Sequence, residues 1–208
     1  MVWSRRLGQL AAFIAIAAVF GVGSNYFFYS EALRGEQRET SGEAQIGGPF
    51  SLVNTEGERV RASDFEGGYT LVLFGYTFCP DVCPMSLIKI TRAIDMLAEQ
   101  APEKAERVTP VFITVDPERD DVEAMRDYVS HFHPRMVGLT GSPSDIEEAA
   151  AAYQVVYWRV ESEQTTQYTM AHTAYTFLMD PNGRLVTRFD HDVSPESVAK
   201  ALTDKVSG

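Results

Sequence analysis

The pattern of apolar and polar positions divides the chain into short strands and amphipathic helices. Continuous apolar runs bounded by Gly and Pro predict buried strands at residues 70–76 and 108–115. Apolar residues recur at helical spacing from 84 to 100, which predicts a helix with one apolar face. Other patterns predict, in chain order, a hairpin at 50–53 and 59–61, a helix at 121–130, a strand at 137–140, a helix at 142–152, a strand at 155–160, a hairpin at 175–179 and 185–189, and a helix at 194–204.

This order of elements predicts an α/β domain built on a mixed sheet with helices on both faces. Sites in such sheets lie beyond the carboxyl ends of the parallel strands. Cys79 and Cys83 follow the strand at 70–76, and Asp116 follows the strand at 108–115. We therefore expect the functional site at this edge of the sheet.

The N-terminal part is predicted to be a membrane anchor. Residues 7–29 carry no charge, and a helix of that length spans a bilayer core. Arg5 and Arg6 precede the run and Glu31 follows it, which holds the N-terminus in the cytoplasm and exports the rest. A cleaved signal peptide is the alternative. The short segment before the run leaves no room for a mitochondrial transit peptide, so we expect a bacterial inner-membrane protein with a periplasmic domain. The predicted parts are an anchor at 1–30, a polar tether at 31–47 and a folded domain at 48–208.

Composition narrows the class of partner. The 208 residues include 29 acidic and 18 basic ones, for a net charge of −11. Nucleic acid is disfavoured as a partner because its phosphates require Lys and Arg. The chain has two cysteines, too few for a disulfide framework, and such a close pair is typical of redox or metal chemistry.

Cys79 and Cys83 lie at the junction between the strand at 70–76 and the helix that follows. Pro84 is predicted to be the first helical residue, so the positive end of the helix should lower the pKa of both thiols. A three-residue spacer suits chelation of one metal ion and also permits a disulfide. Two thiolates favour Cu(I), zinc or iron–sulfur chemistry. Structural zinc and iron–sulfur clusters usually need four protein ligands, whereas copper accepts two sulfurs and one imidazole, so copper is favoured.

Four histidines are candidates for the third ligand. His131 and His133 lie in a polar connection and His191 lies between two aspartates, so all three are expected on the surface. His172 stands just before the strand at 175–179. From its position alone, His172 is open to either a structural or a metal-binding role.

Three motifs together resemble the Sco/SenC family of membrane-anchored copper chaperones for cytochrome c oxidase assembly. They are GYTFCPDVCP at 75–84, TVDPERD at 114–120, and HT at 172–173 followed by YTFLMD at 175–180 and by Gly183. The resemblance runs from about residue 48 to the C-terminus, with the motifs in the family's order.

The resemblance implies a thioredoxin-like fold in which the entry to the strand at 175–179 lies against the cysteine loop. It makes Cys79, Cys83 and His172 the ligands of one copper ion, as Cu(I), Cu(II) or both. Asp81 and Asp116 match acidic positions near the site, where they are expected to support the ligands or to contact a partner.

The implied function is delivery of copper to the dinuclear copper centre of cytochrome c oxidase subunit II. A periplasmic copper donor or a thioredoxin-like reductant would be a further partner. One alternative is a thiol–disulfide reductase for that subunit, in which Cys79 and Cys83 cycle through a disulfide. A peroxidase related to peroxiredoxins is a third, which is disfavoured because residues 77–86 hold no arginine and Arg119 is the one nearby candidate.

Overall fold

The computed structural model describes residues 45–161 and 168–207. The chain from Gln45 onward forms one compact unit. The predicted anchor at 1–30 and nearly all of the tether lie outside the described residues. Within the described ranges, no helix combines the length and the apolar character needed to cross a membrane.

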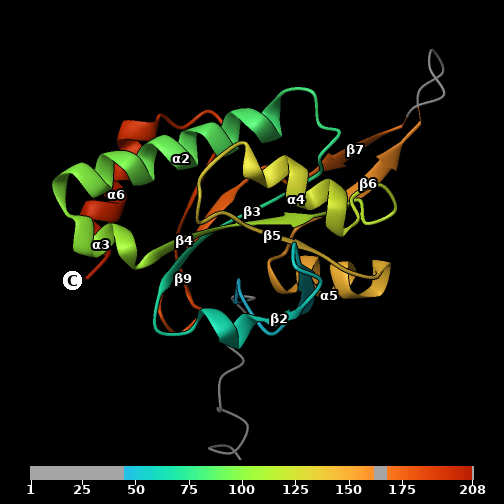
Figure 1. Cartoon of the computed structure of the whole chain (residues 1–208), viewed down its shortest axis with the longest axis horizontal. Coiled ribbons are helices and arrows are strands. Elements are labelled where there is room, and N and C mark those ends of the chain that lie inside the picture. The colour runs from blue at the N-terminus through green and yellow to red at the C-terminus, as the bar shows by residue number, and fades with distance from the viewer. Residues whose placement is uncertain (1–44, 162–167, 208) are drawn as a thin grey trace, which may run out of the picture. The chain divides into compact units, whose positions relative to one another are not determined.

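A seven-stranded mixed sheet forms the centre of this unit (Figure 1). Its order is β2-β1-β5-β4-β3-β8-β9, in which β3, β4 and β5 run parallel and the other pairings are antiparallel. A separate antiparallel ribbon is made of β6 (Tyr157–Val160) and β7 (Thr169–His172). The sheet strands are β1 (Ser51–Asn54), β2 (Arg59–Arg61), β3 (Tyr69–Gly75), β4 (Val108–Thr114), β5 (Val137–Thr140), β8 (Thr176–Met179) and β9 (Leu185–Phe189).

Helices cover both faces of the sheet, as Figure 1 shows. One face carries α2, α3, α4 and α6, and the other carries α5. Because side chains alternate along a strand, β3 feeds both cores: Leu71 and Leu73 join the first, Val72 and Phe74 the second. The helices are η1 (Ala62–Phe65), α2 (Val82–Gln100), α3 (Pro102–Glu106), α4 (Val122–Ser130), α5 (Pro143–Ala152) and α6 (Pro195–Lys205).

All the predicted strands and helices are present, but the start of α2 differs from the prediction. The helix begins at Val82, with Asp81 at its N-cap, so Cys83 lies inside the first turn. Pro84 is tolerated there because the first backbone N–H groups of a helix have no intrahelical partner. The pattern did not predict η1, α3 or β7, which have four or five residues each.

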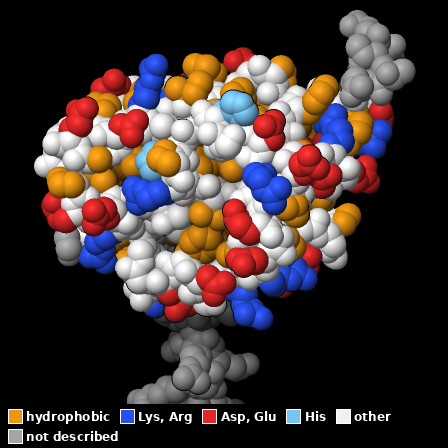
Figure 2. Space-filling view, viewed as in Figure 1, with side chains coloured by type: hydrophobic (Ala, Val, Ile, Leu, Met, Phe, Trp, Pro, Cys, Tyr) orange, Lys and Arg blue, Asp and Glu red, His pale blue; other side chains and the backbone are white. Residues whose placement is uncertain are grey.

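The surface of this unit mixes charges of both signs. Figure 2 shows acidic and basic side chains interspersed with apolar ones over the face that carries α2 and α4. On this face, therefore, neither sign of charge forms one extended patch.

Candidate metal centre

The loop between β3 and α2 brings the two cysteines together. The backbone N–H of Cys83 donates to Cys79 Sγ at 3.4 Å, and both thiols are free. Cys83 is 1% exposed, whereas Cys79 is half-buried. The packing requires Gly75 at the end of β3, because a Cβ there would lie 2.8 Å from both Cys83 Sγ and the ring of Phe112.

The β6–β7 ribbon supplies the imidazole. His172 ends β7, and its Nε2 lies 3.6 Å from Cys83 Sγ. Its Nδ1 lies 3.0 Å from the carbonyl oxygen of Thr173, so Nδ1 carries the proton and Nε2 presents its lone pair to the sulfur. The ring of Tyr76 packs edge-on against the imidazole at 6.0 Å between centroids. Two segments far apart in the sequence therefore meet at this point.

The spacing of Cys83 and His172 suits a shared ion. A sulfur at about 2.3 Å and a nitrogen at about 2.0 Å from one ion, at a near-tetrahedral angle, lie about 3.5 Å apart. The observed separation of 3.6 Å agrees with this value. Two sulfurs and one imidazole form a soft donor set of the kind that selects Cu(I). Over residues 45–161 and 168–207, no group of three or more His, Cys, Asp or Glu side chains has the spacing of a formed metal site.

The two thiols have opposite electrostatic character. A hydrogen bond from the Cys83 thiol, together with the backbone N–H groups of Cys83 and Asp81, outweighs the effect of burial and lowers the pKa of Cys79 to about 3. The pKa of Cys83 is raised, first because its thiol donates to Cys79, then by burial and by the Cys79 charge. The expectation of a lowered pKa is confirmed for Cys79 and wrong for Cys83, where burial and the neighbouring thiolate outweigh the helix terminus.

The two predicted carboxylates occupy different positions. Asp116 is 3% exposed and accepts hydrogen bonds from Arg119 Nε at 2.5 Å and from the Tyr168 hydroxyl at 2.8 Å. The Arg119 guanidinium lies over the rings of Tyr168 at 3.6 Å and Phe78 at 5.0 Å. Asp116 therefore orients an arginine that packs on the cysteine loop. Asp81 is exposed, at the N-cap of α2.

Sequence reasoning missed Asp120, a buried carboxylate beneath the cysteine loop. It is 0% exposed and accepts from the Thr77 backbone at 2.9 Å and from the hydroxyls of Thr77 and Thr114 at 2.6 Å each. These bonds fasten the start of the loop to the end of β4. The sequence held one signal for Asp120. A threonine stands at the end of each of two neighbouring strands, and this aspartate follows nearby in the chain.

The remaining histidines occupy structural or surface positions. His131 and His191 are exposed, as expected. His133 is 7% exposed, so its predicted surface position is wrong. Its burial is accommodated because Nδ1 accepts a hydrogen bond from the backbone N–H of Arg135 at 3.1 Å.

Comparison with known proteins places this site in a family. The SCO1/SenC family model matches residues 38–207. The mitochondrial SCO1 homolog 1 of Arabidopsis thaliana is 43% identical over 169 residues, covering 80% of this chain and 48% of that protein. The chain thus spans about half the length of that relative. A SCO2-like protein of Rickettsia prowazekii is 36% identical over 198 residues, covering 92% of this chain and 95% of its own.

The fold agrees with that of solved relatives. The crystal structure of Arabidopsis thaliana ScoI with copper bound has a TM-score of 0.72 and 40% identity, covering 76% of this chain and 96% of that one. The predicted mixed α/β, thioredoxin-like fold is thereby confirmed for the folded unit. The chain belongs to the SCO1/SenC family.

Proposed function

We propose that this chain is a copper metallochaperone for cytochrome c oxidase assembly. Cys79, Cys83 and His172 would bind one copper ion and deliver it to the dinuclear copper centre of oxidase subunit II. The observation that carries the proposal is the lone pair of His172 Nε2 facing Cys83 Sγ at 3.6 Å. Family membership and the copper-bound Arabidopsis relative support it.

The arrangement supports stepwise transfer of the cargo. Cys79 is half-buried and already a thiolate, so it is the ligand that an incoming partner thiolate reaches and displaces first. Cys83 is buried, and copper binding would release its proton. His172 lies on the β6–β7 ribbon, apart from the main sheet. Three-coordinate copper leaves a position open for the partner at each exchange.

We propose that copper transfer takes place in the periplasm. Residues 1–30 would anchor the chain in a bacterial inner membrane with the N-terminus in the cytoplasm, and residues 31–47 would tether the domain at 48–208. The uncharged run at 7–29, flanked by Arg5 and Arg6, supports this topology. A periplasmic copper donor or a thioredoxin-like reductant would load or reduce the pair.

A thiol–disulfide reductase is the second candidate. It is favoured by the thiolate–thiol pair itself, since Cys79 has a pKa of about 3 and Cys83 keeps its proton. His172 distinguishes the two functions, because disulfide exchange needs no imidazole lone pair. The peroxidase alternative is disfavoured because the nearby candidate, Arg119, is paired through Nε with Asp116 and stacked on Tyr168.

Copper titration of the reduced full chain tests the proposal. We expect one tightly bound equivalent, which the Cys79→Ser, Cys83→Ser double variant loses and His172→Ala weakens strongly. His131→Ala is the matched control, since that histidine is exposed and its ring contacts Ser130 and the Asp127 carbonyl rather than a cysteine. Retention of a tight equivalent by the double variant would end the chaperone assignment.

Oxidase assembly is tested in membranes of a deletion strain. We expect oxidase activity and its copper content to return with the wild-type chain and not with His172→Ala, and added copper to restore part of both. Full complementation by His172→Ala would favour the reductase.

A further inference from the structure

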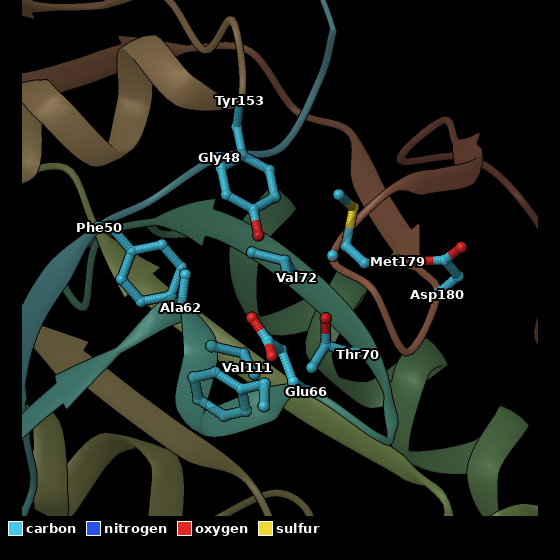
Figure 3. Close-up of a pocket in the computed structure, with 12 residues that line it drawn as sticks. Gly48, Phe50, Ala62, Glu66, Thr70, Val72, Val111, Tyr153, Met179 and Asp180 are labelled. Atoms are coloured by element: carbon cyan, nitrogen blue, oxygen red, sulfur yellow. The ribbon is translucent and has the colours of Figure 1, made fainter.

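A pocket lies at the opposite end of β3 from the cysteine loop. It opens between η1, the start of β3 and the turn that joins β8 to β9, and Figure 3 shows its interior. Thr70 and Val72 line it from β3, whereas Gly75 at the other end of that strand contacts Cys83. A rise of about 3.3 Å per strand residue puts Thr70 about 17 Å and Val72 about 10 Å from Gly75. It is therefore separate from the metal centre.

Three polar groups without partners point into this pocket. Tyr153 is 5% exposed and Thr70 is 7% exposed, and Glu66 stands at the mouth. Figure 3 shows the two hydroxyls and the Glu66 carboxylate directed toward one another across the space. None of these groups hydrogen-bonds to any other described residue. Neither hydroxyl oxygen is sealed from solvent, so both face the space of the pocket, where water or a ligand can hydrogen-bond to them.

The residues that line the pocket favour a ligand with an apolar body and a positive charge. Phe50 and Phe65, with ring centroids 6.4 Å apart, line one side, and Val72 and Met179 line others. The inner lining includes Glu66 and Asp180 and no Lys or Arg. The Asp180 carboxylate points away from the pocket and accepts from the backbone N–H groups of Asn182 and Arg184, so Glu66 supplies the negative charge. Carboxylates attract a cation directly, and aromatic faces do so through their quadrupole.

We propose that this pocket binds the terminal ammonium group of a small aliphatic primary amine. An ammonium group carries three N–H donors, which match the Glu66 carboxylate, the Thr70 hydroxyl and the Tyr153 hydroxyl. The inner cavity volume of about 30 Å³ admits a narrow unbranched group rather than a ring. The remaining alkyl chain extends into the wider cleft that shares Phe50 and Glu66.

Methyl NMR of the purified full chain tests this binding site. With methionines labelled at the ε-methyl carbon, Met179 reports on the pocket wall and Met85, 47% exposed beside Cys83, serves as the internal reference. Titration with n-butylammonium chloride should shift the Met179 signal, assigned with Met179→Leu, and leave Met85 unchanged. The neutral analogue 1-butanol should bind about tenfold more weakly, since it lacks the charge.

Three variants separate the contributions of the polar groups. Glu66→Gln should weaken butylammonium binding about tenfold, and Tyr153→Phe and Thr70→Val severalfold each, because each removes one acceptor. Glu58→Gln is the matched control, an exposed carboxylate outside the pocket. Copper binding should be unchanged in all four variants, so this test is independent of the proposed function. Equal shifts with butylammonium and 1-butanol would show that the pocket does not recognise the positive charge, and no shift at millimolar amine would show that it holds water only. Either result would overturn the proposal.

Discussion

At the scale of single residues, the metal centre depends on a glycine, Gly75, which has no side chain. Gly75 ends β3 directly beneath Cys83 Sγ, and no larger residue fits between that sulfur and Phe112. Substitution there tests whether this close approach sets the position of Cys83.

We expect Gly75→Ala to lower the free energy of unfolding by about 1–3 kcal/mol, the usual cost of overpacking a core. Copper affinity should fall too, because Cys83 Sγ must shift to admit the new methyl. Gly48→Ala is the control, since its Cβ meets Ala152 at an ordinary 3.4 Å. Denaturant unfolding and copper competition measure the two effects. Unchanged values for Gly75→Ala would contradict the geometry at the end of β3.

Ionisation of Cys79 gives a second prediction at this scale. With a pKa of about 3, Cys79 is a thiolate throughout the range from about pH 5 to pH 8, so its rate of alkylation in the copper-free, reduced chain should be nearly flat there. A cysteine of ordinary pKa, about 8.5, would instead gain about tenfold in rate per pH unit. Cys83 should stay unmodified, because it is buried and protonated. Peptide mass spectrometry measures both sites, and a steep pH rise at Cys79 would refute the assignment.

At the scale of elements, the spacing of apolar residues predicted most of the strands and helices. A long element with a buried face repeats its apolar residues at a regular interval. The helix at 84–100 and the strands at 70–76 and 108–115 each bury one face or both, and that leaves a clear pattern. The ribbon strand β7 has only four residues, half-buried at most, so its pattern is too short to read. The local sequence identified the cysteine pair, whereas the place of His172 and the raised pKa of Cys83 arise from contacts across the fold.

Asp120 connects the cysteine loop to the end of β4, and a substitution there measures how much this connection stabilises the fold. Its removal in Asp120→Ala leaves the donors of Thr77 and Thr114 unsatisfied in the protein interior. We expect the free energy of unfolding to fall by at least about 3 kcal/mol, since three donors are orphaned and each costs about 1–3 kcal/mol. Asp127→Ala, at an exposed position on α4, should stay within about 0.5 kcal/mol of the wild type. Equal stability of the two variants would show that the loop is held in place by other contacts.

At the scale of the whole molecule, the candidate ligands join two parts of the fold that share no β-pairing. Cys79 and Cys83 belong to the loop and helix that follow the seven-stranded sheet, whereas His172 belongs to the β6–β7 ribbon. Without copper, the ribbon contacts the cysteine loop through His172 and through Arg119, whose guanidinium lies over Tyr168. A bound ion would therefore cross-link the two sheets.

Hydrogen exchange should detect this cross-link. Copper binding should slow exchange at the paired amides of β6 and β7, because opening the ribbon would then require breaking a metal–imidazole bond. The amides of α6, on the far side of the sheet from α5, should change little and provide the reference. In His172→Ala the ribbon should exchange equally fast with and without copper, even if the two sulfurs still retain some metal. Protection of the ribbon by copper in that variant would mean that the cysteine loop alone holds the ion and that the imidazole is not a ligand.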